Sequence, residues 1–598
     1  MSRQTPGLES GPARRVLDQE FAQWVRRSFC QDCDEEQGLS VESLAMAVSH
    51  ALNLKHSCLD LNRYPALQDS LLNEFLAGVD PERVRNLTGG AVGAENSASK
   101  PVPLVCSADG SLVWLQKYHG FERGVAGMVR DMTQDRAELS QDQKESLDVL
   151  YPDKEFSEQR KAVETALSSR FSIITGGPGT GKTWTVARII AVMIKQGLED
   201  GRKPRIALAA PTGKAAARML ETLHQAATSE QIGQLIGAAE LPDKARTLHS
   251  LLGISRRSPR PRHNANNPLA IDVLIVDEAS MVDLPMMNRL LNACPANARL
   301  ILLGDKDQLA SVEAGSVLGE LCNPHSAHYE ALRSSIAVIN RSYRYQDSPE
   351  IGALATAINA VRPLPDFGHN KHVTRSELKA GDDPWTPGWL DKASQRYASL
   401  AALIGEDSTV ADILRQQMDF QILCALRNGP AGVSGINAML ASALGKRPGD
   451  WYAGLPVMVT VNDHDRKLFN GDVGLVLPVR NDGDQWLIDA EAGKLKACFF
   501  TGDGAVKAIS LAQMPGFDTC YAITVHKSQG SEYDKILFVL PASAEQVENN
   551  PVITRELLYT GVTRARKEVE IWCGRGVLEA ATRQETIRMS GLGHQLIQ

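Results

Sequence analysis

The sequence predicts an α/β protein with two parallel-sheet layers, a small β-barrel inserted in the second layer, and a mainly helical region ahead of both. Three observations support this fold class. Short, continuously apolar runs alternate with helical stretches from about residue 157, the alternation recurs after residue 420, and residues 451–518 carry short strands separated by turn signals. Continuous apolar runs are typical of strands buried on both faces of a parallel sheet, and helices between them indicate a doubly wound layer.

The region that precedes the sheets is expected to be mainly helical. Helical spacing runs through residues 16–85, and a further helix is expected from Trp114 to Met132. Residues 88–103 are small and polar and predict an exposed loop, whereas the acidic stretch 135–159 predicts a linker into the next domain.

Each parallel layer is predicted from its apolar runs. The first layer is expected to contain strands at 171–175, 206–209, 273–276 and 300–303, and the second strands at 420–426, 536–540 and 569–573. Turn signals within residues 451–518 predict the barrel. These signals are Asn470-Gly471, Asp482-Gly483 and Gly502-Asp503-Gly504.

Composition excludes several classes of protein. With 43% hydrophobic and 23% charged residues, the 598-residue chain is not disordered as a whole. A formal net charge of −7 excludes a histone-like protein that holds DNA by bulk charge, but it leaves room for a local basic channel. Residues 1–150 carry 15 basic and 22 acidic side chains, so the whole net charge lies there and the remainder is neutral.

Cysteines and apolar runs predict a cytoplasmic location. Ten scattered cysteines form no compact framework, which fits a reducing compartment, and the close pair Cys30 and Cys33 lacks the further ligands of a zinc site. The first fifteen residues lack the apolar core of a signal peptide, and no apolar run approaches the roughly 18 residues of a membrane span.

A glycine-rich segment follows the first predicted strand and opens a predicted helix at 184–196. It fits the pattern GxxxxGK[ST] in the structural context that a phosphate-binding loop requires. Glycines allow the backbone N–H groups to curl around a phosphate, and the helix N-terminus adds partial positive charge. Lys182 would reach the β- and γ-phosphates, and the Thr183 hydroxyl would bind Mg²⁺. The segment consists of Gly176, Gly177, Pro178, Gly179, Thr180, Gly181, Lys182 and Thr183.

Polar residues end the neighbouring strands as well. Asp277 and Glu278 follow the strand 273–276; Asp277 would hold Mg²⁺, and Glu278 would orient and deprotonate the attacking water. Gln308 follows the strand 300–303 and is a candidate sensor of the γ-phosphate. Because ligands bind at the carboxyl ends of strands in open α/β sheets, one shared site is expected. No guanine-reading NKxD occurs, so the nucleotide is expected to be ATP.

Seven segments between about 157 and 570 together resemble the motifs of superfamily 1 helicases, and their sequences are most similar to those of the RecD branch. In order they are GGPGTGKT, APTGKAAARM, LIVDEAS, GDKDQL, NRSYRY, TVHKSQGSE and YTGVTRAR. The resemblance implies two RecA-like P-loop domains, an SH3-like inserted barrel and 5′→3′ translocation on single-stranded DNA. We expect domains at 1–140, at 141–345 with a small hairpin inserted near 250–270, and at 346–598 with the barrel near 451–518.

The same resemblance implies further site residues. Gln159 would recognise adenine, Tyr343 would stack on the base, Glu532 would bind the ribose, and Arg344 and Arg564 would contact the γ-phosphate. An arginine from a second domain would stabilise transition-state charge, so that domain closure becomes a mechanical stroke. The catalytic set is therefore Lys182, Asp277, Glu278, Gln308, Arg344 and Arg564. The DNA strand would lie on Thr212, Lys214, Thr247, His249, Thr524, His526 and Lys527, hydroxyl and basic side chains that suit tracking without sequence readout.

Two further regions bear on partners. The basic run 255–263, with Arg256, Arg257, Arg260 and Arg262, is either close to DNA or a solvated loop. The acidic first 150 residues resemble, more weakly, the amino domain of RecD; this implies docking onto RecC in a complex with RecB that unwinds duplex ends during double-strand-break repair by homologous recombination. Alternatives are a solitary RecD-like helicase and an assembly subunit whose ATP site only gates partner contacts.

Overall fold

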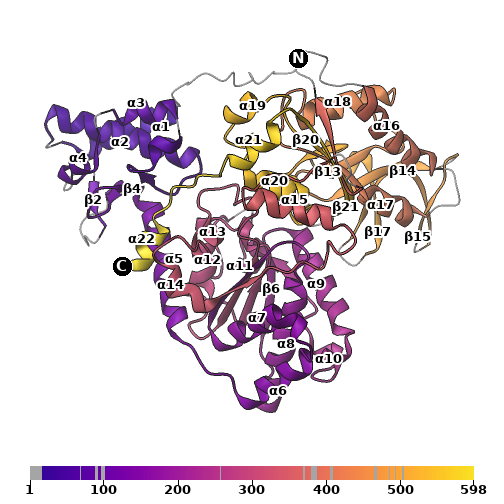
Figure 1. Cartoon of the computed structure of the whole chain (residues 1–598), viewed down its shortest axis with the longest axis horizontal. Coiled ribbons are helices and arrows are strands. Elements are labelled where there is room, and N and C mark those ends of the chain that lie inside the picture. Colours follow the sequence, from indigo (N-terminus) through magenta and orange to yellow (C-terminus); the bar gives the residue numbers. More distant parts are fainter. Residues whose placement is uncertain are drawn as a thin grey trace.

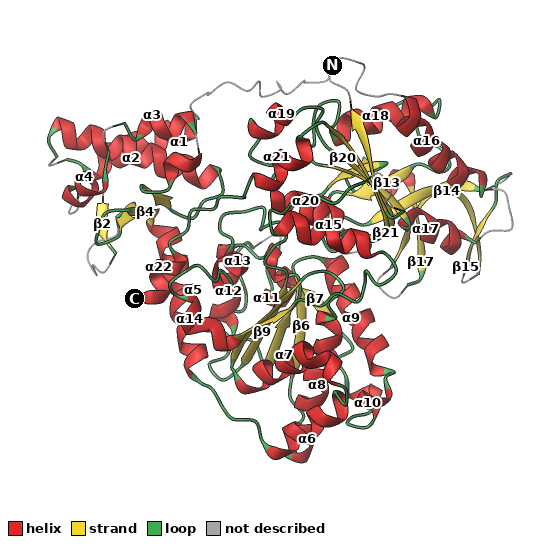
Figure 2. Cartoon of the chain, in the orientation of Figure 1, coloured by secondary structure: helices red, strands yellow, loops and turns green. Residues whose placement is uncertain are grey.

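The structure, a computed structural model, describes residues 16–598 with short gaps (Figures 1 and 2). The gaps are 32, 68, 78, 88–91, 96–101, 256–257, 368–370, 379–386, 405–408, 464–465, 467, 484, 492 and 502–503. Three parts are visible. A small N-terminal region lies at the upper left, and a parallel sheet flanked by helices lies at the bottom. A second parallel sheet with an antiparallel extension lies at the upper right.

The first parallel sheet contains all four strands that the apolar runs predict, together with two more at its edges. Every pairing in it is parallel. In spatial order the strands are β10 (Ile336–Ile339), β5 (Phe171–Gly176), β9 (Arg299–Gly304), β8 (Val273–Val276), β6 (Ile206–Ala210) and β7 (Ala245–Thr247). β7 was not predicted because its sequence, Ala-Arg-Thr, contains no apolar run.

Helices cover both faces of this sheet, and strand residues alternate between the two cores. Leu300 and Leu302 face one core and Ile301 and Leu303 the other. The first core is covered by α11 (Leu248–Leu252), α12 (Leu284–Ala293), α13 (Val317–Leu321), α14 (Tyr329–Leu332) and α5 (Gln116–Gln134). The second is covered by α6 (Gln141–Leu150), α7 (Ser157–Ser168), α8 (Lys182–Glu199), α9 (Gly213–Ala227) and α10 (Glu230–Gly233).

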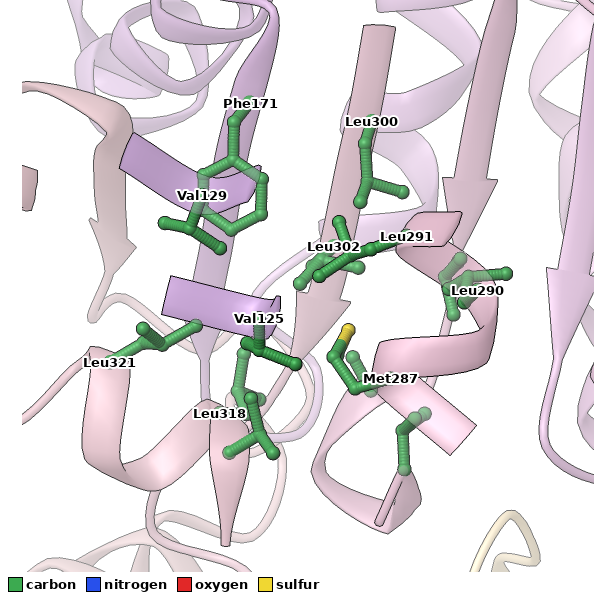
Figure 3. Close-up of a cluster of buried hydrophobic side chains, with 14 of the residues drawn as sticks. Val125, Val129, Phe171, Met287, Leu290, Leu291, Leu300, Leu302, Leu318 and Leu321 are labelled. Atoms are coloured by element: carbon green, nitrogen blue, oxygen red, sulfur yellow. The ribbon is translucent and has the colours of Figure 1, made fainter. Parts of the chain in front are cut away.

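Helix α5 belongs to the core of the first sheet. Val125 and Val129 are buried in the same cluster as Phe171 and Leu300, and Figure 3 shows Val129 beside Phe171 and Val125 beside Leu318. Burying a valine side chain contributes about 1.5–3 kcal/mol, so α5 contributes to the stability of this layer. The domain boundary expected near residue 140 stays a prediction, and the packing of α5 crosses it.

The second parallel sheet contains the three strands predicted for it, and two edge strands complete it. In spatial order these are β11 (Val373–Leu378), β21 (Ala565–Gly574), β20 (Tyr533–Val539), β12 (Phe420–Cys424) and β19 (Ala522–Thr524). Its helices are α15 (Pro349–Asn359), α19 (Ala544–Glu548), α20 (Arg555–Val562) and α21 (Val577–Arg583) around one core, and α16 (Pro387–Ala402) and α18 (Val433–Ala443) around the other.

An antiparallel sheet is inserted between β12 and β19. Its order is β17 (Val506–Ser510), β16 (Lys494–Phe500), β14 (Val473–Asp482), β13 (Pro456–Val459) and β18 (Phe517–Thr519), with β15 (Gln485–Ile488) paired to β14. Gly483 has a φ of +67° in the β14–β15 turn, a conformation that favours glycine. Helix α17 (Val410–Met418) packs against β14. Closure into an SH3-like barrel stays a prediction, and the turn signal at Gly502-Asp503 lies outside the described residues.

The N-terminal region combines helices with a small sheet. It contains α1 (Val16–Phe29), α2 (Glu35–Asn53), α3 (Ser70–Phe75), α4 (Pro81–Asn86), β1 (Leu59–Asp60), β2 (Val92–Ala94), β3 (Leu104–Cys106) and β4 (Leu112–Leu115). The helix expected from Trp114 in fact begins at Gln116, because Leu112–Leu115 is a strand paired with β1 and β3. A four-residue apolar run fits a buried strand or a helix equally well by periodicity. Most of the loop expected at 88–103 lies outside the described residues.

The C-terminal segment returns to this N-terminal region (Figure 1). The Ser57 N–H donates to the Met589 carbonyl (3.0 Å), and the Met589 N–H donates to His56 Nδ1 (3.0 Å). Met589 is buried in the core of the N-terminal region, and α22 (Leu592–Ile597) packs on α5. The last residues therefore join the N-terminal region to the first sheet.

A buried carboxylate lies at this junction. Glu122 of α5 is fully buried and accepts hydrogen bonds from Ser57 Oγ (2.6 Å), Trp114 Nε1 (2.7 Å), Ser590 Oγ (3.0 Å) and the Gly591 N–H (3.1 Å). Burial, reinforced by the nearby charge of Glu320, raises the pKa of Glu122 to about 7. The donors thus come from the N-terminal region and the C-terminal segment, and one carboxylate connects them.

Stability is expected to depend on pH through Glu122. Between its ordinary pKa of 4.5 and about 7 the folded protein holds a proton that the unfolded chain has lost. Its contribution to the free energy of unfolding is therefore full below pH 4.5 and falls by about 3 kcal/mol as pH rises through 7. Glu122→Gln removes this titration, so the melting temperature of the variant relative to wild type should rise from pH 5 to pH 8 in scanning fluorimetry.

Glu145→Gln on α6 serves as the control, because the Glu145 carboxylate lies at the surface of the protein. That control should show no such trend with pH. A Glu122→Gln protein whose melting temperature follows that of wild type at every pH would contradict the assignment of the titration to Glu122.

No described helix is both long enough and apolar enough to cross a bilayer. All ten cysteines lie in the described part, and none forms a disulfide. Among described residues no three His, Cys, Asp or Glu side chains gather closely enough to hold a metal ion, the Cys30 and Cys33 region included.

Candidate functional site

The glycine-rich segment forms the turn between β5 and α8. β5 ends at Gly176 and α8 begins at Lys182, so the eight predicted residues surround one helix N-terminus. Gly179 has a φ of +74°, and a Cβ there would lie 2.2 Å from the Arg344 Cβ, so no larger residue fits. Lys182 Nζ donates to the carbonyls of Gly176 (2.5 Å) and Gly177 (2.9 Å), which directs its charge along the loop.

A cavity of about 650 Å³ opens beside this turn and extends to the second sheet. It brings together most of the predicted nucleotide residues from both layers. Those that line it are Gln159, Pro178, Gly179, Thr180, Gly181, Lys182, Thr183, Asp277, Glu278, Gln308, Tyr343, Arg344, Glu532 and Arg564. Gly176 and Gly177 do not line it; their carbonyls accept from Lys182 Nζ.

Two acids face Lys182 in this cavity. Asp277 and Glu278 follow β8, and Glu278 has a φ of +52°, a left-handed conformation in which its N–H donates to Asp277 Oδ1 (2.8 Å). Burial and the neighbouring Glu278 charge raise the pKa of Asp277 to about 6. Burial also lowers the pKa of Lys182, although the charges of Asp305, Glu278 and Asp277 oppose this shift. A non-glycine residue in a left-handed conformation is strained, and such residues are common at functional sites.

This donor set fits a Mg²⁺ ion that arrives with a nucleotide. The Thr183 hydroxyl and the Asp277 carboxylate are the hard oxygen ligands that Mg²⁺ prefers, and both line the cavity. Protein groups usually supply only one or two Mg²⁺ ligands, with water and phosphate oxygens supplying the others. A cation there would also offset the repulsion from Glu278 that, together with burial, raises the pKa of Asp277.

Gln308 and its neighbours connect the two layers. Gln308 Nε2 donates to Asp305 Oδ2 (3.0 Å), and the Tyr559 hydroxyl of α20 donates to the same oxygen (2.9 Å). The Leu309 N–H donates to Thr560 Oγ1 (2.9 Å). Asp305, Tyr559 and Thr560 were not assigned roles from the sequence, although they lie inside the motifs GDKDQL and YTGVTRAR.

Two arginines enter the cavity next to Glu532. Arg344 pairs with Glu532 and also donates to the Thr563 carbonyl (3.4 Å). Arg564 is 3% exposed and donates through Nε to the Thr560 carbonyl (3.1 Å) and through Nη1 to the Ser531 carbonyl (3.3 Å). Both guanidinium groups thus contact the second layer, and they line the same cavity as the glycine-rich segment of the first.

Aromatic and amide groups form the remaining wall. Gln159 Nε2 donates to the Thr180 carbonyl (3.2 Å), which leaves its carbonyl oxygen as an acceptor. Tyr343 stacks on Phe156 at 5.8 Å between ring centroids, and its N–H donates to the Gly179 carbonyl (2.9 Å). Tyr151 also lines the cavity. Phe156 and Tyr151 were not predicted, because isolated aromatic residues in a polar stretch resemble ordinary packing residues.

The predicted DNA-contacting residues lie mostly at or next to strand ends, some in the first parallel sheet and some in the second. Thr212 caps α9 and Thr247 caps α11, at the ends of the paired strands β6 and β7. Thr524 ends β19, where its hydroxyl accepts from the Lys527 N–H (3.3 Å), and Lys527 pairs with Asp518 (3.2 Å).

Three basic residues of this set have specific partners or shifted pKa values. Lys214 Nζ donates to Ser531 Oγ (2.8 Å), and burial lowers the pKa of Lys214 to about 8. Burial also lowers the pKa of His249 and of His526, so both imidazoles favour the neutral form. Lys214 therefore bridges the two layers, while the histidines present hydrogen-bonding rather than charged groups.

The basic run and the hairpin expected near 250–270 are described only in part. Arg256 and Arg257 lie outside the described residues. Arg260 and Arg262 are exposed, and two isolated antiparallel bridges, Ser255 to Ser258 and Asn264 to Asn267, occur in this stretch.

Comparisons with known proteins bear on this site. Residues 159–314 match the family described as an AAA domain, and residues 519–571 match the UvrD-like helicase C-terminal domain. The chain is 36% identical to the RecBCD enzyme subunit RecD of Haemophilus influenzae, over 76% of this chain and 74% of that protein. It is 39% identical to the protein of the same name from Mycolicibacterium smegmatis, over 74% and 75%. The ATP-dependent RecD2 DNA helicase of Deinococcus radiodurans is 30% identical over 68% of this chain and 48% of that protein.

Proposed function

This chain belongs to the RecD family, and from that premise we propose that it is an ATP-dependent DNA helicase that works as a subunit of a RecBCD-type complex. One observation carries the proposal. A phosphate loop, two acids and two arginines from two separate parallel sheets line one cavity. A nucleotide between two such layers can pull them together, which is how hydrolysis produces movement.

We assign the steps of hydrolysis to named side chains. Lys182 and the backbone N–H groups of the loop bind the phosphates, and Glu278 accepts the proton of the attacking water. Thr183 and Asp277 would hold Mg²⁺, which neutralises phosphate charge when bound. Arg344 and Arg564 stabilise the charge that develops on the γ-phosphate, and Gln308 orients the water or senses the phosphate.

The remaining contacts position the two ligands. Gln159 and Tyr343 bind the base and Glu532 the ribose, in keeping with the free amide oxygen of Gln159 and the stacked ring of Tyr343. Single-stranded DNA lies along the edge formed by Thr212, Lys214, Thr247, His249, Thr524, His526 and Lys527. Because Lys214 donates to Ser531 and Thr212 lies near Gly530, the proposed DNA and ATP sites share structural neighbours. The 5′→3′ direction of translocation rests on the likeness to the RecD branch.

The proposed partners are RecB and RecC. The acidic N-terminal region would bind RecC and avoid DNA, because its excess negative charge repels phosphate. The chain matches about three quarters of the length of relatives named as RecBCD subunits but 48% of RecD2, which favours a subunit over a solitary helicase. The complex would unwind duplex ends in double-strand-break repair by homologous recombination, in the cytoplasm. A gating role without turnover is disfavoured by the complete set of catalytic side chains in the cavity.

The decisive experiment is an unwinding assay on duplexes with 5′ or 3′ single-stranded tails. The purified chain is tested alone and with RecB and RecC, and a complex that contains Lys182→Ala isolates the contribution of this motor. The proposal expects ATP-dependent unwinding of the 5′-tailed duplex that Lys182→Ala abolishes, together with co-elution with RecB and RecC. Unwinding only from 3′ tails would refute the polarity, and efficient unwinding by the chain alone with no co-elution would favour the solitary helicase.

A further inference from the structure

Helix α9 of the first layer docks on the loop Gly530-Ser531-Glu532 of the second. Gly530 lies close to Ala215 and Thr212, since a Cβ on it would be 3.7 and 3.9 Å from their side chains. One helical turn apart on α9, Lys214 donates to Ser531 Oγ (2.8 Å) and Arg218 forms an ion pair with Glu532. Residues at i and i+4 share a helix face, so these two contacts form one continuous interface between the layers.

Glu532 is shared by two guanidinium groups. Arg344 pairs with Oε1 and Arg218 with Oε2. The side chains of Glu532 and Arg344 are each 14% exposed, whereas that of Arg218 is 42% exposed and can adjust without leaving solvent. Burial opposes ionisation of Glu532, but the charges of Arg344 and Arg218 outweigh it and lower the pKa of Glu532 to about 2.

Arg344 lies within reach of two different anionic groups, the Glu532 carboxylate and a nucleotide phosphate bound in the cavity. It pairs with Glu532, and it also lines the cavity beside Gly179, where a nucleotide phosphate would lie. If Arg344 turned to a phosphate while Glu532 had no other cation, a buried carboxylate would be left unpaired, which is strongly unfavourable. Arg218 removes this obstacle because it already occupies the other carboxylate oxygen. Burial opposes the charge of Arg218, but Glu532 and, to a lesser degree, Glu278 and Asp277 outweigh it and raise the pKa of Arg218.

We propose that Arg218 is a positioning residue for ATP hydrolysis: it keeps Glu532 paired so that Arg344 is released to the γ-phosphate. The inference rests on the proposed function and adds a residue to it. Without Arg218, Glu532 retains Arg344 as its partner, and Arg344 does not reach the γ-phosphate. The defect should therefore appear in turnover of ATP and not in binding of ADP, which has no γ-phosphate for Arg344 to contact.

The test is a double-mutant cycle on the full-length chain with single-stranded DNA. Steady-state ATP hydrolysis is measured for wild type, Arg218→Ala, Arg218→Lys, Glu532→Gln and Arg218→Ala/Glu532→Gln, and affinity is measured with fluorescent mant-ADP. We expect Arg218→Ala to lower kcat about 30-fold while the mant-ADP Kd changes less than about threefold. Arg218→Lys keeps a positive charge and should recover most of the loss.

Glu532→Gln distinguishes positioning from a purely structural contact. A neutral amide does not trap Arg344, so adding Arg218→Ala to Glu532→Gln should lower kcat less than about threefold further. Arg415→Ala is the matched control, because it removes another exposed helical arginine, paired with Asp412 (2.7 Å) on α17 away from the cavity. That control should hydrolyse ATP at the wild-type rate, and circular dichroism verifies that each variant is folded.

Several results would overturn the inference. These are a wild-type kcat in Arg218→Ala, an equal loss of kcat with and without Glu532→Gln, or a loss of mant-ADP binding in parallel with kcat. If wild type itself showed no DNA-stimulated hydrolysis, the proposed function would be wrong and the inference would fall with it. If wild type hydrolysed ATP and Arg218→Ala matched it, the proposed function would stand and only the role of Arg218 would be lost.

Discussion

Replacing Lys182 with alanine is expected to reduce DNA-stimulated ATP hydrolysis at least about a thousandfold. Lys182 is half-buried at the start of α8, and its Nζ donates to the Gly176 and Gly177 carbonyls, beside which the phosphates would be held. A preorganised charge in a site that excludes water contributes several kcal/mol to transition-state stabilisation, and about 4 kcal/mol corresponds to this factor. Hydrolysis is measured as phosphate release at saturating ATP and single-stranded DNA.

Lys195→Ala provides the control on the same helix. Lys195 pairs with Glu199 (3.6 Å) and donates to Ser146 Oγ (3.2 Å), more than three turns from the loop. That variant should hydrolyse ATP at close to the wild-type rate. Retention of a tenth or more of wild-type turnover by Lys182→Ala would remove the lysine, and the loop with it, from the proposed mechanism.

Arg564→Ala should separate nucleotide binding from hydrolysis. Arg564 is provided by the second layer, and an arginine that completes a phosphate site from another domain typically contributes 10³–10⁵ in rate. We expect kcat to fall about a thousandfold while the Kd for fluorescent mant-ATP changes by less than about fivefold. Arg564→Lys should remain far below wild type, because an ammonium group cannot reproduce the two hydrogen bonds to the Thr560 and Ser531 carbonyls.

Arg566→Ala is the neighbouring control for this experiment. Its side chain is half exposed and pairs with Asp534 (2.9 Å) outside the cavity. Binding and hydrolysis should both stay near wild type. An equal loss of binding and hydrolysis in Arg564→Ala would instead indicate that the buried guanidinium supports the fold of the loop around Ser531.

Local patterns were sufficient for much of the fold. The seven predicted strands of the two parallel layers are confirmed. Each is a short continuous apolar run that alternates with helical stretches, and this alternation is typical of a parallel sheet covered by helices. The turn between β5 and α8 could likewise be located from eight adjacent residues. The short edge strand β7 had no comparable signal, and the strand at Trp114 had one that also fits a helix.

Contacts between distant parts of the chain could not be predicted. The hydrogen bond from Tyr559 to Asp305 joins residues 254 positions apart, and the contact of Lys214 with Ser531 spans 317 positions. Nothing in the local sequence of α9 indicates that Arg218 faces Glu532. Such pairings depend on how the two layers dock, which is a property of the whole packed chain.

The return of the C-terminal segment has a consequence for synthesis of the protein. Met589 completes the core of the N-terminal region, and Ser590 and Gly591 supply two of the donors to Glu122. At roughly 5–20 residues per second, these residues leave the ribosome on the order of 25–90 s after Glu122 does. The N-terminal region must therefore wait, with an incomplete core, until residues 589–591 have been made. A nascent chain that stalls before residue 589 would present this unfinished surface to chaperones and proteases.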